Sequence, residues 1–79
     1  MTNNVKVAAT LLEMHSKGMP LTIAKIAVDA NVHAMNVGDF LRYWVAVGWL
    51  TKRREGRRMI FSMTKNGEEG FATLVHKSG

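Results

Sequence analysis

The hydrophobic pattern of this chain changes its period at Gly48, and this change restricts the possible folds more than any other feature. Before Gly48, apolar residues recur at about 3.6-residue intervals, as they do in amphipathic helices. After it, the segments WLTKRRE and RRMIFSM alternate with a period of about two, which predicts two strands joined around Glu55-Gly56 as a hairpin. Thr64 then offers an N-cap for a last helix over residues 65–77. The predicted order is helix, helix, helix, hairpin, helix, which is an α+β fold.

The first predicted helix covers residues 5–17. Asn3 or Asn4 can cap its start, and Gly18 with Pro20 beyond it ends the helix. Its buried stripe is expected to contain Val5, Ala8, Leu12 and His15, widened by Leu11 and Ala9.

Two further helices are predicted before the hairpin. The second covers residues 22–31, with the Thr22 hydroxyl at its N-cap and Asn31 in the left-handed conformation at its end. Its apolar face is narrow and consists of Ile23, Ile26 and Ala27. The third covers residues 34–47, with an inward face of Val37, Phe40, Leu41, Trp44 and Gly48. Its outward face carries Met35, Asn36, Asp39, Arg42, Tyr43 and Ala46.

The second strand and the last helix complete the expected core. One face of the strand carries Met59, Phe61 and Met63, and the other carries Arg58, Ile60 and Ser62. We expect Met59 and Met63 to lie in the core, together with the aromatic side chains of Phe40, Trp44, Trp49 and Phe61. The apolar stripe of the last helix consists of Phe71, Leu74 and Val75.

Composition limits the chain to one small domain, residues 1–79. Of its 79 residues 47% are hydrophobic, which is enough for a modest core. The absence of cysteine excludes disulfides and thiolate metal sites and is compatible with the reducing cytoplasm. The N-terminal residues lack a secretion signal, and no run approaches the roughly 20 apolar residues of a membrane span. We therefore expect a soluble, cytoplasmic protein without a membrane partner.

No group of residues predicts catalysis, a metal site or a cofactor. His15, His33 and His76 lie in different predicted elements and lack the spacing of metal ligands. Gly67 and Gly70 lie at a helix start and not after a buried parallel strand, which argues against a nucleotide-binding loop. The sequence therefore predicts a protein that is not an enzyme.

The charge of the chain is concentrated in one segment. The formal net charge is +5 at pH 7 and the isoelectric point is about 10.1, which favours polyanionic partners. Five of the eleven Lys and Arg residues fall within the seven positions 52–58, in the predicted hairpin. This clustering indicates nucleic-acid binding, and the alternative is a solvated charged turn.

Two stretches of the sequence carry a family resemblance. The first stretch is LTIAKIAVDANVHAMNVGDFLRYWVAVGWL. In it Thr22 matches the cap before the first helix of the motif, Ala27 the small residue at the helix crossing, and Asn31-Val32 the turn. Val37 and Leu41 match the buried positions of the recognition helix, and Gly48-Trp49-Leu50 the exit into the wing. In the second stretch, GRRMIFSMTKNG, the matching positions are Phe61, Met63, Thr64 and Gly67. Together the stretches cover residues 21–67 and resemble the winged helix-turn-helix family of bacterial and phage transcription regulators, including its MarR and PadR branches.

The resemblance implies that the chain binds duplex DNA through a recognition helix and a hairpin wing. In the family, Ser or Thr often precedes the recognition helix, whereas this chain has His33. The opening turn Ala34-Met35-Asn36 also lacks the Ser, Thr, Gln, Arg or Lys that the family usually offers to bases.

The basic residues of the hairpin are candidates for contacts with phosphates or with a narrow minor groove. They are Lys52, Arg53, Arg54, Arg57 and Arg58. Because neighbours on a strand point to opposite faces, not all of them can contact DNA at once. Arg57 and Arg58, near the predicted hairpin tip, are favoured.

Outward residues of the third helix are candidates for reading bases. Asn36 could form a paired hydrogen bond with adenine, and Arg42 could contact guanine or a phosphate. Tyr43 could donate to a phosphate, while Asp39 could accept from cytosine or pair with Arg42. Lys25 could reach a phosphate beside the start of the second helix. The alternative for each is ordinary solvated surface.

Other partners remain open at this point. The outward surface of Met35, Asp39, Tyr43 and Ala46 also suits a protein-interaction module, and electrostatics alone would also fit RNA. Apolar residues of the terminal helices could form a homodimer interface or complete the core of a single copy, and the latter is favoured. They are Leu11, Leu12, Leu74 and Val75.

Overall fold

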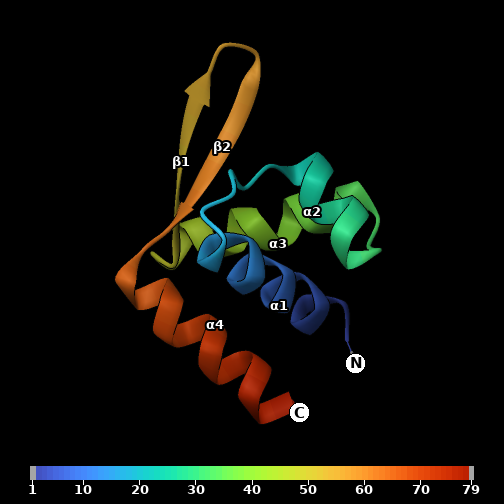
Figure 1. Cartoon of the computed structure of the whole chain (residues 1–79), viewed down its shortest axis with the longest axis vertical. Helices are drawn as coiled ribbons and strands as arrows, with labels where there is room; N and C mark the ends of the chain where they lie inside the picture. The colour runs from blue at the N-terminus through green and yellow to red at the C-terminus, as the bar shows by residue number, and fades with distance from the viewer. Residues whose placement is uncertain (1, 79) are drawn as a thin grey trace.

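The computed structural model describes residues 2–78 and has the predicted order of elements. The helices are α1 (Asn3–Ser16), α2 (Ile23–Ala30), α3 (Ala34–Ala46) and α4 (Lys65–Ser78), and the strands are β1 (Leu50–Glu55) and β2 (Arg58–Met63). The hairpin of β1 and β2 projects from the helical body, and the two chain ends lie away from its tip (Figure 1). The predicted α+β arrangement is confirmed.

Local capping residues set the bounds of α2 and α3. The backbone N–H of Lys25 donates to the Thr22 hydroxyl over 3.3 Å, and Asn31 has φ 55°, as predicted. The predicted cap of α1 is wrong, because Asn3 and Asn4 already lie within the helix and Thr2 holds the N-cap position.

Among the described helices, none is long and apolar enough to cross a membrane.

The buried stripe of α1 differs from the prediction. Val5, Ala8 and Leu11 are buried as expected, but Val7 and Met14 are buried too. Leu12 and Ala9 are only half-buried and His15 is exposed. The reason is that α1 packs against both α2 and α4, so its contact surface is wider than one stripe and is turned toward Val7 and Met14.

Phe71 of α4 lies at the aromatic centre of the core. It is fully buried, and the rings of Trp44 and Trp49 meet it nearly edge-on at centroid distances of 4.7 and 5.1 Å. Phe40 stacks on Trp44 at 5.8 Å. Such edge-on pairs add to the stabilisation that burial of the rings provides. The predicted core positions of these aromatic side chains are confirmed.

Residues of the terminal helices also contribute to this core. Leu11 is fully buried, and Leu12, Leu74 and Val75 are half-buried and packed against it. These four side chains therefore contribute to the core of one copy.

The hairpin closes through a two-residue turn and is fixed to the body at its other end. Gly56 has φ +64°, as the first central residue of a type II′ turn requires. The prediction of a single inward face on β2 is wrong, because both Ile60 and Phe61 are buried. Leu21, between α1 and α2, pairs with Phe61 along the edge of β2, and residues 18–21 line a hollow together with Ile60.

We call residues 49–51 and 59–64 the hairpin base. Thr64 joins it to α4, since its hydroxyl donates to the carbonyl of Gly48 over 2.7 Å and accepts from the N–H of Gly67 over 3.0 Å. Trp49 packs so closely on α4 that a Cβ added at Gly67 would overlap its carbonyl group, and one added at Gly70 would overlap its ring. The base is therefore anchored to both α4 and the connection before α2.

Candidate nucleic-acid interface

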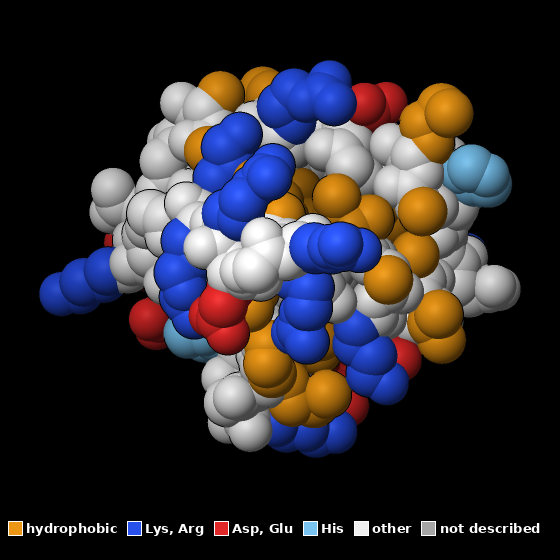
Figure 2. Space-filling view, turned by 90° about the horizontal axis from the view of Figure 1, so that it is seen from above, with side chains coloured by type: hydrophobic (Ala, Val, Ile, Leu, Met, Phe, Trp, Pro, Cys, Tyr) orange, Lys and Arg blue, Asp and Glu red, His pale blue; other side chains and the backbone are white. Residues whose placement is uncertain are grey.

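We call residues 52–58 the hairpin tip. All five basic side chains of this segment are exposed, namely Lys52, Arg53, Arg54, Arg57 and Arg58. Figure 2 looks down on the projecting hairpin and shows Lys and Arg side chains around it, with hydrophobic side chains exposed beside them. The tip is thus a strongly positive projection next to an apolar surface.

The strand register divides these cations between two faces. Lys52 lies opposite Phe61 and Arg54 lies opposite Met59, so both cations share a face with these two side chains. Arg53 lies opposite Ile60 and therefore belongs to the other face. Since Lys52 lines a hollow with Arg42, Gly38 and Val45 of α3, its face is the one beside that helix.

Ion pairing distinguishes the cations further. Arg53 Nη2 lies 3.2 Å from Glu55 Oε2, so Glu55 partly neutralises the face that points away from α3. Within residues 2–78, no carboxylate oxygen lies within 4 Å of the charged groups of Lys52, Arg54 or Arg57. These three keep their full charge for an external anion.

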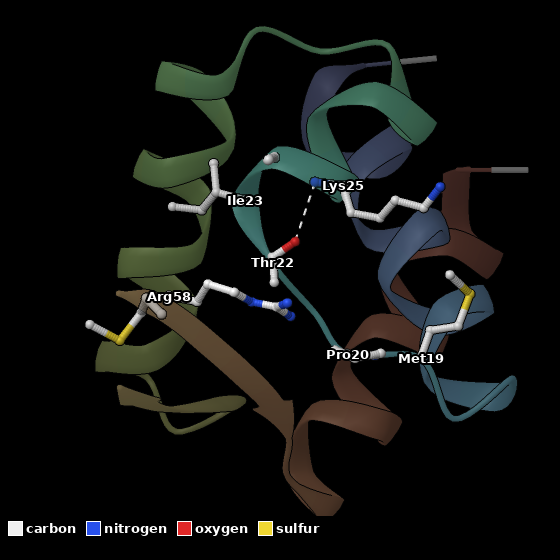
Figure 3. Close-up of a pocket in the computed structure, with 8 residues that line it drawn as sticks. Met19, Pro20, Thr22, Ile23, Lys25 and Arg58 are labelled. Atoms are coloured by element: carbon white, nitrogen blue, oxygen red, sulfur yellow. Dashed lines mark hydrogen bonds between the residues drawn. The ribbon is translucent and has the colours of Figure 1, made fainter. Parts of the chain in front are cut away.

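Arg58 lies at the hairpin tip beside Arg57, as predicted. Arg57 lies in the turn, and Arg58 is the first residue of β2. Its guanidinium points toward the start of α2, where it lines a hollow with Met19, Thr22 and Lys25 (Figure 3). The cause is the strand pleat, which places Arg58 on the same face as Ile60, toward the connection before α2.

The outward face of α3 is exposed along its whole length. Asn36, Asp39 and Arg42 are exposed, as are the apolar surfaces of Met35 and Tyr43, which are 71% and 65% accessible. Arg42 Nη1 lies 3.6 Å from Asp39 Oδ1, so of the two alternatives for Asp39 the structure contains the pair with Arg42. Arg42 of this face and Lys52 of the hairpin line the same hollow.

Lys25 lies at the first turn of α2 and is exposed. Its Nζ is 3.3 Å from Asp29 Oδ1, one turn further along the helix. Because this pair is local and exposed, it holds the lysine only weakly.

The sequence did not reveal how α3 begins. His33 replaces the usual hydroxyl residue, yet its Nδ1 accepts a hydrogen bond from the backbone N–H of Met35 over 3.2 Å and so caps the helix. The other two histidines lie elsewhere: His15 Nε2 is 3.5 Å from Glu68 Oε1 between α1 and α4, and His76 is exposed on α4. In the described part of the chain, no three His, Cys, Asp or Glu side chains are grouped as metal ligands would be.

Three helices followed by a hairpin and a last helix, with α2 and α3 joined by a tight left-handed turn, define a winged helix-turn-helix fold. No protein-family model matches the chain, and no curated protein matches it. Solved structures do match, and they share the fold predicted from the family resemblance.

Three of these structures illustrate the likeness. The protein AF1382 of Archaeoglobus fulgidus is 18% identical with a TM-score of 0.83, over 91% of this chain and 79% of that one. A protein of Ralstonia eutropha JMP134, described as a proposed DNA-binding protein, is 25% identical with a TM-score of 0.73, over 91% and 93% of the two chains. A variant of Staphylococcus aureus MepR bound to an oligodeoxyribonucleotide is 18% identical with a TM-score of 0.72, over 99% of this chain and 59% of that one.

Proposed function

We propose that this chain is a small cytoplasmic transcription regulator that binds duplex DNA as one domain and catalyses no reaction. The observation that carries the proposal is the hairpin tip, where Lys52, Arg54 and Arg57 are exposed, positively charged and free of carboxylate partners within residues 2–78. The hairpin projects from the helical body that contains α3 (Figure 1), and the outward face of α3 is exposed. A projecting hairpin and an exposed helix can contact a groove and its flanking backbone together.

In the proposed complex, α3 lies in the major groove and the hairpin contacts the adjacent backbone and minor groove. Lysine and arginine side chains that meet phosphates release condensed counterions, and this release supplies most of the affinity that is independent of sequence. Lys52 and Arg42 border the same hollow, so they can hold phosphates on one side of the groove. The DNA-bound MepR variant and the Ralstonia eutropha protein are neighbours in fold whose descriptions support this assignment.

The remaining candidates have secondary roles in this proposal. Asn36 faces adenine, Tyr43 donates to a phosphate, and Lys25 reaches the backbone beside the start of α2. Arg53 and Arg58 lie on the face away from α3. They contribute to DNA affinity through the positive electrostatic potential of the hairpin tip more than through direct contacts. RNA and protein partners are the alternatives that the experiment must separate from duplex DNA.

Salt titration of binding to a random-sequence DNA duplex tests the proposal. We expect the logarithm of the association constant to fall linearly with the logarithm of the salt concentration, by about 0.9 for each phosphate neutralised. The double variant Arg54→Gln, Arg57→Gln should weaken binding to all sequences and make this slope shallower by about two units, one for each lost contact.

A matched variant removes the same charge elsewhere. Lys6 lies on α1 and Lys77 lies in the last turn of α4, away from the hairpin, so Lys6→Gln, Lys77→Gln should leave the slope nearly unchanged. If both double variants lost the same amount of DNA affinity and of salt dependence, binding would depend on the net charge of the protein and not on the hairpin tip. Absence of binding to duplex DNA at low salt, or tighter binding to structured RNA at matched salt, would refute the proposal.

A further inference from the structure

The face of α3 that would enter the major groove is apolar at its start. Residues 34–41 contain neither Lys nor Arg, and their exposed members are Ala34, Met35, Asn36 and Asp39. Met35 is 71% accessible. Guanine is most often read by Arg or Lys, whereas the thymine methyl group is read by apolar contact and adenine by an amide. The first turn of α3 therefore carries the chemistry of an A·T reader.

The two charged residues of this face are already paired with one another. Arg42 could read guanine and Asp39 could accept from cytosine, but their charged groups lie 3.6 Å apart. Because this pair is local and exposed, it competes only weakly with contact to a G·C pair. The pair also lessens the repulsion that a lone carboxylate would meet in an anionic groove.

The hairpin tip favours the same base pairs by a different route. Arg57 lies in the turn, is exposed, and has no carboxylate within 4 Å among the described residues. Tracts of A·T pairs narrow the minor groove and concentrate its negative potential, which attracts arginine. In that groove the 2-amino group of guanine also obstructs a side chain that A·T pairs admit.

We propose that the chain, if it binds duplex DNA as proposed above, prefers A·T-rich sites. Met35 packs on thymine methyl groups in the major groove, and Arg57 enters the narrow minor groove next to it. Each contact favours A·T pairs by itself, so their effects can be measured separately.

Modified duplexes separate the two grooves. An A·T-rich duplex should bind more tightly than a G·C duplex of equal length at the same salt concentration. Replacing thymine with uracil removes only the major-groove methyl group and should weaken binding about fourfold for each methyl group that Met35 covers. An inosine·cytosine duplex lacks the minor-groove amino group of G·C and should bind more tightly than the G·C duplex.

Single variants assign these preferences to residues. Met35→Ser should abolish the preference for thymine over uracil, whereas Val28→Ser, which changes another exposed apolar side chain on α2, should preserve it. Arg57→Lys keeps the charge and hence the salt slope, but should lose the preference for inosine·cytosine over guanine·cytosine, because lysine is more strongly hydrated than arginine.

The outcomes separate this inference from the proposed function. Salt-dependent binding with equal affinity for A·T and G·C duplexes, or with a G·C preference, would overturn the inference and leave DNA binding intact. If Met35→Ser and Val28→Ser both keep the preference for thymine over uracil, Met35 does not contact the thymine methyl group. That result is expected if this face of α3 contacts a protein instead. Failure to bind any duplex at low salt would refute both proposals.

Discussion

The hairpin base and the hairpin tip belong to the same two strands but meet opposite surroundings. At the base, Leu50 and Phe61 are buried, and Thr64 and Trp49 connect the strands to α4. At the tip, every residue from 52 to 58 is exposed. Packing stabilises the fold, whereas exposed charge contributes little to it but can attract a polyanion. Stability and DNA affinity should therefore respond to substitutions in different halves of the hairpin.

The largest loss of stability is expected for Phe71→Ala, below the hairpin base. The substitution removes a fully buried ring and its edge-on contacts with Trp44 and Trp49, and should lower the free energy of unfolding by about 3–5 kcal/mol. A chain of this size is expected to have only about 4–12 kcal/mol in total. Urea unfolding followed by tryptophan fluorescence and circular dichroism measures the loss. Phe71→Leu should cost much less, and a cost below 1 kcal/mol for Phe71→Ala would contradict this view of the core.

A pair of glycine substitutions tests the fit between α4 and the hairpin base. In Gly67→Ala the new methyl group would overlap the Trp49 carbonyl, so α4 must shift, at a cost of about 1–3 kcal/mol. In Gly38→Ala the added carbon lies 3.8 Å from Ile23 Cδ1, which is an ordinary contact, and helix propensity should stabilise the chain by about 0.5–1 kcal/mol. The two substitutions should change the free energy of unfolding in opposite directions, as measured by thermal or urea unfolding. If both were stabilising, the close approach of Trp49 to α4 would be absent.

A smaller effect is expected where Thr64 joins β2 to α4. Thr64→Ala removes the N-cap of α4 and the hydrogen bond to Gly48, and should cost about 0.5–2 kcal/mol. Thr64→Ser retains the hydroxyl and should recover most of the loss. If serine were no better than alanine in urea unfolding, the hydroxyl would not be what anchors the base.

The parts of the fold that follow from local chemistry could be predicted from the sequence. The change of period at Gly48, the cap at Thr22 and the left-handed Asn31 depend on residues near each other in the chain. Packing between distant segments could not be predicted in the same way. Periodicity indicates one stripe for α1, but α2 and α4 both contact it. Ile60 is buried where a connection from another part of the chain lies beside β2.

The candidate site shows the same limit. Exposure of Met35, Asn36 and Arg42 follows from helical spacing, and the Asp39–Arg42 pair follows from their separation. The direction of Arg58 depends on which strand face meets α2, and this is a tertiary property. A hydrophobic pattern also gives no sign that His33 caps α3, although its position before the helix is the signal that could have suggested it.

The smallest change in stability is expected at the hairpin tip. Arg54→Gln, Arg57→Gln should change the free energy of unfolding by less than about 0.5 kcal/mol, because both side chains are exposed and neither has a carboxylate within 4 Å among residues 2–78. Because the variant removes two of five neighbouring cations, it reduces their mutual repulsion and should stabilise the hairpin slightly, with a larger effect at low salt. Urea unfolding of this variant, measured beside its salt-dependent DNA binding, gives both quantities for one protein. A loss of stability above 1 kcal/mol would mean that the tip takes part in packing, whereas reduced affinity at unchanged stability would assign binding to the tip and folding to the base.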